Sequence, residues 1–286
     1  MSSPHQSREA LAAHEVSAAA PEAIMSREVT RWRAGRRFTE LDDLAVEEPC
    51  ELRVGGHSVA VVMRTPGHDQ DLARGFLITE GIVGALAEVA TIEAGDEPNV
   101  IEVRLVAGHH FDPERLRRNL YASSSCGLCG KASIKAVRVL AQPLRGKPLV
   151  SAAVLAGLDN VLQAGQEVFR RTGALHGAGL CDGDGRLLVV REDVGRHNAV
   201  DKVIGAALAA GTPDLAHCIL VVSGRASFEV TQKALVAGIP TLAAVSAPSS
   251  LAVELAQAGG MLLAGFVRGG AMTVYSAPER LVSTVP

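Results

Sequence analysis

Apolar and polar residues alternate along this chain with two different periods. A period of two residues indicates strands, and a period of about 3.6 residues indicates helices. In the first half, residues 51–54 and 58–64 flank two glycines, which predicts a β-hairpin because paired glycines permit the positive φ of a tight turn. Residues 69–80 have acids in the first turn and one shared apolar face, which predicts a helix. Residues 99–106 predict a strand.

The second half alternates short apolar runs with amphipathic segments. Strands are predicted at residues 175–180, 187–190, 219–223, 241–245 and 261–266. Helices are predicted at residues 198–210, 228–237 and 249–258, and a long helix over 151–171 is expected to start at a Ser151 cap. Such alternation indicates a three-layer α/β domain with a largely parallel central sheet.

Three segments divide the chain, which is α+β overall. Residues 1–25 are rich in Ala, Ser, Glu and His without periodicity, so we expect a disordered tail. Residues 26–145 predict a mixed α+β N-terminal domain, and residues 146–286 the α/β domain. The boundary is placed at residues 142–148, which contain two prolines and a glycine.

Composition narrows the class of protein. The 286 residues are 48% hydrophobic and 21% charged, an ordinary globular balance. The net charge of −3 gives no overall positive field that would attract nucleic acid. Apolar runs stay well short of the roughly 18 residues of a membrane helix, and the N-terminus lacks a secretory signal pattern. We expect a cytoplasmic protein that binds neither nucleic acid nor membrane.

The five cysteines suggest reactive chemistry rather than a disulfide framework, because their number is odd. Only Cys126 and Cys129 are close in sequence. The other three, Cys50, Cys181 and Cys218, are expected to be small buried apolar residues.

The segment around the cysteine pair, residues 121–130, breaks all periodicity, and its small residues predict an exposed loop. A neighbouring thiol or cation raises the thiolate fraction of a cysteine, and Lys131 lies two residues after Cys129. Such a loop can hold a persulfide whose outer sulfur is passed on by thiol exchange.

Three other interpretations compete for this loop. A structural zinc site needs two further close ligands, whereas the remaining cysteines are scattered, so no metal is expected. A thioredoxin-like redox pair follows a buried strand, but a serine run precedes this pair. Accidental spacing of two buried cysteines is disfavoured by the surrounding glycines and serines. We therefore favour a sulfur-carrying loop.

Polar residues also concentrate at predicted strand ends. His176 follows a helix end inside an apolar strand, where a core histidine is an equally good interpretation. Eight of the twelve residues from 191 to 202 are charged or polar, Arg196 and His197 among them. A solvated helix start would explain these charges, but such concentrations near strand ends line the ligand clefts of α/β proteins.

Three further strand ends have the character of anion sites. Ser223, Gly224 and Arg225 follow a strand and precede a helix, whose free N–H groups and dipole favour an anion. Residues 246–250 repeat the arrangement. The last strand leads into Phe266, Val267, Arg268, Gly269, Gly270 and Ala271. Together they predict a phosphate-bearing ligand across the sheet edge, without the phosphate loop of ATP hydrolases.

In this order, the motifs resemble the formate dehydrogenase accessory sulfurtransferase family (FdhD). The matching segments are residues 124–131, 169–176, 192–202, 223–227 and 265–270, within a similarity from about residue 27 to residue 275. The resemblance implies a cytidine-deaminase-like C-terminal domain, a homodimer, and a role in maturing a molybdenum- or tungsten-dependent formate dehydrogenase.

The resemblance also implies partners and roles. A cysteine desulfurase would load sulfur onto Cys126, with Cys129 as the partner of this persulfide carrier. The chain, a sulfurtransferase, would pass the sulfur to the molybdenum bis(molybdopterin guanine dinucleotide) cofactor before its insertion into the formate dehydrogenase apoenzyme. The stretch from Phe266 to Ala271 matches the family's cofactor-binding residues, and the pyrophosphates of this guanine-nucleotide-bearing cofactor suit the anion loops.

Two rival functions remain. Zinc deaminases use His-x-Glu followed by Pro-Cys-x-x-Cys, but here Gly177 and Ala178 follow His176 and the cysteine pair precedes it, so this chemistry is not expected. A chaperone that holds the cofactor or the apoenzyme without moving sulfur would need the anion loops and not the cysteines. Replacing Cys126 by alanine separates it from a carrier.

Overall fold

The computed structural model describes residues 21–109, 144, 148–211 and 215–283. Residues 110–143, which include Cys126 and Cys129, lie outside the described part. So does most of the predicted domain boundary at residues 142–148.

The N-terminal domain is a four-stranded sheet in the order β4-β3-β6-β5 with one helix against it. The predicted hairpin over residues 51–64 is confirmed, since β3 and β4 pair antiparallel around two glycines of positive φ. Leu52 on β3 and Leu77 on α2 meet in its core. The elements are β3 (Glu48–Val54), β4 (His57–Arg64), α2 (Asp69–Thr79), η3 (Leu86–Glu88), β5 (Val89–Ala94) and β6 (Val100–Leu105).

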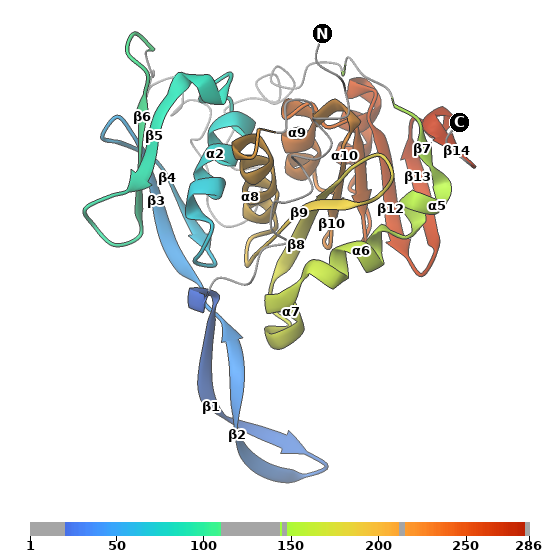
Figure 1. Ribbon diagram of the computed structural model, residues 1–286. Coiled ribbons are helices and arrows are strands. Elements are labelled where there is room, and N and C mark those ends of the chain that lie inside the picture. The colour runs from blue at the N-terminus through green and yellow to red at the C-terminus, as the bar shows by residue number, and fades with distance from the viewer. Residues whose placement is uncertain (1–20, 110–143, 145–147, 212–214, 284–286) are drawn as a thin grey trace.

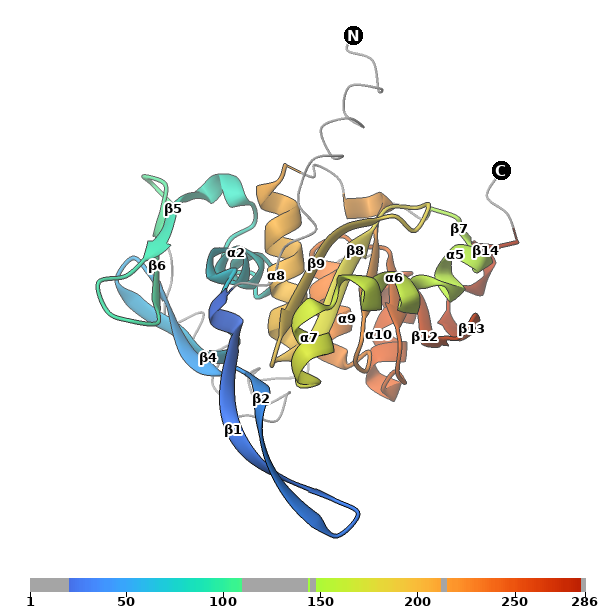
Figure 2. The ribbon, with the colours of Figure 1, turned by 60° about the horizontal axis from the view of Figure 1, so that its bottom comes forward.

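A long hairpin, which the pattern analysis did not predict, precedes this domain and projects away from the body (Figures 1 and 2). It consists of β1 (Ile24–Arg33) and β2 (Arg36–Ala45), and we call it the arm. A short helix, η2 (Pro21–Ala23), lies at its root. The segment predicted as a tail, residues 1–25, therefore extends into ordered structure at its end.

The C-terminal domain has three layers around a six-stranded sheet in the order β13-β12-β11-β10-β8-β9 (Figures 1 and 2). One face packs on α8, α9 and α10, and the other on α5 (Ala152–Ala156) and α6 (Leu158–Gly165), each through its own apolar cluster. The three-layer prediction is confirmed. The sheet and its main helices are β8 (His176–Cys181), β9 (Leu187–Asp193), α8 (Arg196–Ala209), β10 (Ile219–Val222), α9 (Phe228–Val236), β11 (Thr241–Ala244), α10 (Ser250–Gly259), β12 (Leu262–Arg268) and β13 (Ala271–Ser276).

The sheet is mixed, so the prediction of a largely parallel sheet is wrong. Only the β10–β11 and β11–β12 pairings of this sheet are parallel. The strands β8 and β9, like β12 and β13, are joined by tight turns, and a tight turn can connect only antiparallel neighbours.

The predicted long helix over residues 151–171 is also wrong, because the structure divides it into three. These are α5 (Ala152–Ala156), α6 (Leu158–Gly165) and α7 (Glu167–Thr172), separated at Gly157 and Gln166. The side chain of Ser151 makes no cap hydrogen bond. Instead, Glu192 accepts hydrogen bonds from the N–H groups of Val168 (2.8 Å) and Phe169 (2.7 Å), which fixes α7 by a contact distant in sequence.

Small elements complete the domain, and the two domains meet through α2 and α8. The small elements are β7 (Val150–Ser151), η4 (Leu215–His217), η5 (Pro278–Arg280) and β14 (Leu281–Val282). A Cβ atom on Gly75 of α2 would overlap the backbone oxygen of Asp201, so the two helix backbones touch. None of the described helices has both the length and the apolar character needed to span a bilayer.

Candidate functional site

The carboxyl ends of β10, β11 and β12 bring three of the predicted loops side by side. These loops are residues 223–227, 246–250 and 266–271, and we call them the strand-end row. The N–H of Ser249 donates to the carbonyl of Ala226 at 3.0 Å, which joins the loops that open α10 and α9. The N–H of Phe266 donates to the carbonyl of Ser246 at 3.1 Å, which adds the end of β12. The three loops that the sequence suggested for one anionic ligand therefore adjoin.

Two helices begin at this row. The hydroxyl of Ser227 accepts from the N–H of Val230 (3.4 Å), and that of Ser249 accepts from the N–H of Ala252 (3.2 Å). Each cap satisfies one N–H of the first turn, and the positive ends of both helix dipoles lie at this edge. Such an edge favours phosphate groups.

His176 and Gly224 lie side by side at the start of the row. A Cβ atom on Gly224 would be 3.4 Å from Nδ1 of His176, so glycine leaves the imidazole its place. Burial lowers the pKa of His176, and the positive charge of Arg196 lowers it further. His176 is therefore neutral near pH 7 and can either donate or accept a hydrogen bond.

His197 is held by the beginning of α9. Its Nε2 lies 2.9 Å from Oε2 of Glu229 and 3.3 Å from the hydroxyl of Ser227. Nε of Arg196 is buried and finds no hydrogen-bond partner among the described residues. Arg225 is exposed. The row thus collects cationic side chains from β10–α9 and from the start of α8, which suits an anion.

The hydroxyl of Ser223 has a structural use. It accepts from the N–H of Gly177 at 2.9 Å and so joins the end of β10 to β8. Ser223 is thereby a framework residue of the row.

The end of β12 and the turn that follows it, residues 266–271, contain both a strained aromatic residue and an exposed arginine. Phe266 has a φ of 52° and is 39% exposed, and positive φ in an aromatic residue is strained and clusters at functional sites. Val267 is buried in the core, whereas Arg268, Gly270 and Ala271 are exposed.

Gly269 fixes this turn in place. Its N–H donates to Oδ2 of Asp159 on α6 at 2.9 Å, so the turn is clamped to that helix and this N–H is already used.

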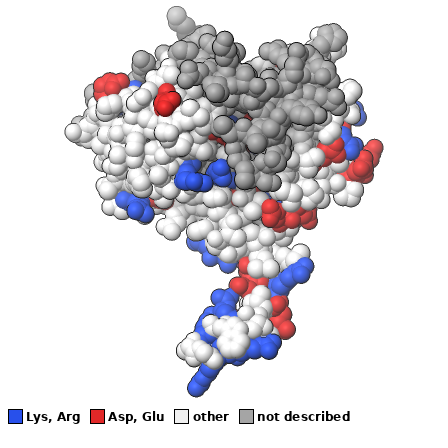
Figure 3. Space-filling model, turned by 180° about the vertical axis from the view of Figure 1, so that it is seen from behind, with Lys and Arg blue, Asp and Glu red and all other residues white. Residues whose placement is uncertain are grey.

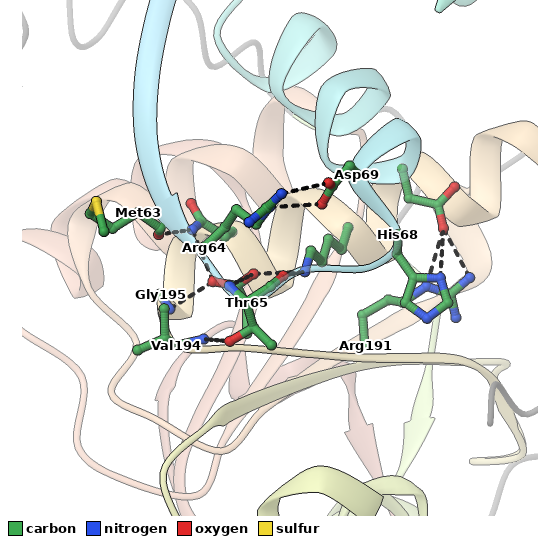
Figure 4. Close-up of polar contacts among 12 residues, drawn as sticks. Met63, Arg64, Thr65, His68, Asp69, Arg191, Val194 and Gly195 are labelled. Atoms are coloured by element: carbon green, nitrogen blue, oxygen red, sulfur yellow. Dashed lines mark hydrogen bonds and ion pairs between the residues drawn. The ribbon is translucent and has the colours of Figure 1, made fainter. Parts of the chain in front are cut away.

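Most of the charged segment from residue 191 to 202 joins the two domains rather than lining a cleft. Nζ of Lys202 lies 2.7 Å from Oδ2 of Asp193 and donates to the carbonyl of Thr65 at 2.8 Å. The amide of Asn198 donates to the carbonyl of Met63 at 2.8 Å. Figure 4 shows these contacts between the end of β4 and the start of α8. The prediction that the whole segment from residue 191 to 202 lines a ligand site is therefore wrong.

The remaining charges of that segment have structural partners as well. Arg191 pairs with Asp71 of α2 at 2.9 Å, and Asp201 with Lys233 at 2.9 Å. Of the charged segment from residue 191 to 202, only Arg196 and His197 lie beside the strand ends that form the row. Residue types cannot reveal this division, because the partners are distant in sequence.

Sequence reasoning missed Glu229 and Asp159. Glu229 fixes a ring of the site, and Asp159 fixes the turn after β12. Each lies in the first turn of its helix, where acids are common for reasons of the helix dipole alone. No signal in the sequence distinguishes them.

The cysteines divide into two groups. Cys50, Cys181 and Cys218 are buried. Burial raises the pKa of the Cys50 thiol to about 11 and that of the Cys181 thiol to about 12. Cys126 and Cys129 lie outside the described residues. In the part of the chain that the structure describes, no three His, Cys, Asp or Glu residues group closely enough to hold a metal ion.

Comparisons with known proteins agree with the motif order. The sulfur carrier protein FdhD of Streptomyces avermitilis is 49% identical over 270 residues, which cover 89% of this chain and 94% of that protein. The protein of the same name from Anaeromyxobacter dehalogenans is 50% identical over 261 residues, covering 86% and 90%.

A solved structure shows the same fold. The crystal structure of a protein from Desulfotalea psychrophila, assigned as a formate dehydrogenase accessory protein, superposes with a TM-score of 0.74 at 24% identity, covering 91% of this chain and 100% of that one. The model of the FdhD/NarQ family matches residues 45–282. A match over this much of the sequence means that the chain belongs to the FdhD/NarQ family.

Proposed function

We propose that this chain is a sulfur carrier that serves formate dehydrogenase, with Cys126 as the thiol that holds the sulfur. One observation carries the proposal. Of the five cysteines, the three in described regions are buried, and burial keeps the thiols of Cys50 and Cys181 protonated near pH 7. This burial supports Cys126 or Cys129 as the carrier thiol. Relatives about half identical over most of the chain are sulfur carrier proteins.

Loading is a thiol exchange. The thiolate of Cys126 attacks the outer sulfur of a cysteine persulfide on a cysteine desulfurase. A bond forms between that sulfur and Sγ of Cys126, the sulfur–sulfur bond on the desulfurase breaks, and the desulfurase cysteine leaves as a thiolate. The electrons balance without an oxidant. The neighbouring Lys131 favours the thiolate that starts the exchange.

Release uses the second cysteine. The thiolate of Cys129 attacks Sγ of Cys126, a disulfide forms between them, and the outer sulfur leaves as hydrosulfide for the acceptor. A cellular dithiol then reduces the disulfide and resets the loop. The two-residue spacing lets the two thiols reach each other.

The proposed acceptor is the molybdenum bis(molybdopterin guanine dinucleotide) cofactor, bound at the row of strand-end loops before its insertion into the apoenzyme. The two helix beginnings and the cationic Arg196, Arg225 and Arg268 suit its pyrophosphates. The exposed ring of Phe266 suits a guanine face, since aromatic side chains stack on bases. We further propose a cytoplasmic homodimer.

The test of the carrier is intact mass after incubation with a cysteine desulfurase and cysteine. The chain should gain the mass of one sulfur atom, and a reductant should remove it. Cys126→Ala should gain none, whereas Cys50→Ala, which removes a buried thiol, should load as the unchanged chain does. Loading of the Cys126→Ala variant to the same extent would overturn the assignment.

The chaperone remains a second candidate, because the strand-end row would serve a protein that only holds the cofactor. The two functions differ in their need for the thiol. Formate dehydrogenase activity in cells that carry only the Cys126→Ala variant should be lost for a carrier, and full activity would leave the chaperone in its place.

A further inference from the structure

The arm is an extended element whose contacts with the rest of the described chain lie at its root. There, Oδ2 of Asp43 lies 2.8 Å from Arg171 of α7, and Ala23, Ile24 and Ala45 join a small apolar cluster. Both strands run for ten residues. A two-stranded hairpin of this kind is only marginally stable alone in water, so most of the arm lacks the packing that usually holds a sheet.

The two faces of the arm differ in how their charges are used. Directly opposed residues of an antiparallel pair share a face, so Arg31 and Phe38 lie on one side with Arg33 and Glu40. On this paired face, Arg31 forms an ion pair with Asp42 at 2.8 Å, and Arg33 with Glu40 at 3.3 Å. Arg31 and Arg33 of the paired face therefore have acidic partners within the arm.

The opposite face presents its side chains to solvent, and we call it the open face. Its outer part is made of Trp32, Arg37 and two threonines, and Glu28 and Leu41 lie opposite each other nearer the root. Trp32 is 69% and Leu41 is 75% exposed, the two largest values among the exposed large apolar residues described. Arg37, opposite Trp32, forms no ion pair with any described residue. Exposed tryptophan beside arginine is the composition of an interface hot spot.

The charge of the outer arm indicates what would cover it. Residues 31–39 include four arginines and no acidic residue, on a chain whose net charge is −3. Figure 3 shows basic groups and uncharged surface at the outer end of the arm, with acidic groups nearer the body. The complementary surface is a protein face that presents carboxylates around an apolar recess.

The root of the arm is tied to the strand-end row. In its apolar cluster, Ala23 packs with Leu175 and Val194. Leu175 directly precedes His176, and Val194 lies two residues before Arg196. The arm therefore begins beside the loops where the cofactor is proposed to bind.

We propose that the open face of the arm docks an acidic partner protein, and that this partner is the formate dehydrogenase apoenzyme. The inference rests on the proposed function, because the protein that takes the cofactor must approach the row at which the cofactor is held. The arm positions that partner while the strand-end loops stay accessible. Its attraction is partly electrostatic and is weakened by salt.

The test compares two aromatic truncations on opposite faces of the same arm. Trp32→Ala should weaken binding of the purified apoenzyme, measured by calorimetry, by about tenfold or more, as expected at a hot spot. Phe38→Ala, the matched control on the paired face, should leave the affinity within about twofold. Arg37→Glu should weaken binding as strongly as Trp32→Ala, and added salt should weaken the binding of the unchanged chain.

Sulfur loading by the desulfurase separates this inference from the proposed function. All three variants should gain one sulfur, since the arm does not carry the thiol. Equal loss of affinity in Trp32→Ala and Phe38→Ala would overturn the docking face. Unchanged apoenzyme affinity in Trp32→Ala would overturn it as well. If that variant instead lost desulfurase binding, the desulfurase would be the occupant of the open face. If it sedimented as a smaller oligomer, the occupant would be a second copy of this chain.

Discussion

Lys202 and Asp193 illustrate how a residue's neighbours decide between a ligand site and a structural pair. Their side chains are only 1% and 0% exposed, and Thr65 contacts both, its N–H donating to Asp193 at 3.2 Å. Each buried charge is offset mainly by the other. From the sequence, the same residue types predict a cleft, because nothing in them tells whether they face a ligand or another part of the chain.

This pairing predicts a large loss of stability from one substitution. Lys202→Met keeps the size of the side chain but leaves Asp193 as an uncompensated buried charge, so the free energy of unfolding should fall by about 3–5 kcal/mol. Urea unfolding measures it. Arg225→Met removes an exposed cation and should change stability by less than about 0.5 kcal/mol. Equal effects of the two substitutions would contradict the pairing.

His68 predicts a pH dependence. Burial, aided by the positive charge of Arg191, lowers its pKa from 6.5 to about 4. Above pH 6.5 the folded and unfolded states are both neutral at this residue. Between pH 6.5 and pH 4 the unfolded chain binds a proton that the folded chain does not, so stability falls as the pH falls.

The expected loss at His68 is at most about 3 kcal/mol across that window, since each pKa unit corresponds to about 1.4 kcal/mol. Because His68 has positive φ, asparagine is the suitable neutral replacement. Urea unfolding of His68→Asn at several pH values should show a shallower decline than the unchanged chain. His176, whose pKa is also lowered, should keep part of the slope. An unaltered slope in His68→Asn would refute this assignment.

At the scale of elements, predictions succeeded where an element has one buried face. The hairpin over residues 51–64 and the helix at Ser250–Gly259 bury one side, and that burial produces the periodicity from which they were predicted. The arm has no buried face along most of its length, so its sequence shows no such period. The division of residues 151–171 depends on Glu192, which no local pattern reveals.

The turn of the arm predicts a stabilising substitution. Ala34 and Gly35 both have positive φ, which is the requirement of a tight two-residue turn between twisted strands. Alanine in this region costs about 1 kcal/mol relative to glycine. Ala34→Gly should therefore slow hydrogen exchange of the arm amides, and Ala34→Val should speed it. Faster exchange in Ala34→Gly would contradict the turn geometry.

At the scale of the whole molecule, the layers were predictable and the strand order was not. Apolar runs report which segments are buried, and hence the three layers around Leu180 and Leu220. They do not report that β8 and β10 are neighbours, because β9, α8 and η4 separate these strands in sequence. The junction between the domains likewise depends on Gly75 of α2 and Gly205 of α8, which lie far apart in the sequence.

The crossing of α2 and α8 therefore carries the last prediction. A Cβ atom on Gly205 would overlap the backbone oxygen of Asp71, so an added methyl group must push the helices apart. This movement would strain the ion pair between Arg191 and Asp71 and the hydrogen bond from Lys202 to the carbonyl of Thr65, which bridge the same junction. Gly205→Ala should lower the free energy of unfolding by about 1–3 kcal/mol or more, measured in urea.

The control is an alanine at a glycine with room. A Cβ atom on Gly157 would have its nearest neighbour at 3.6 Å, an ordinary contact. Gly157→Ala should be neutral or slightly stabilising, because alanine reduces the freedom of the unfolded chain. Since the start of α8 also supplies Arg196 and His197 to the strand-end row, Gly205→Ala should also weaken binding of GDP, a probe that carries the guanine and pyrophosphate of the proposed cofactor. Unchanged stability in Gly205→Ala would mean that the helices do not touch.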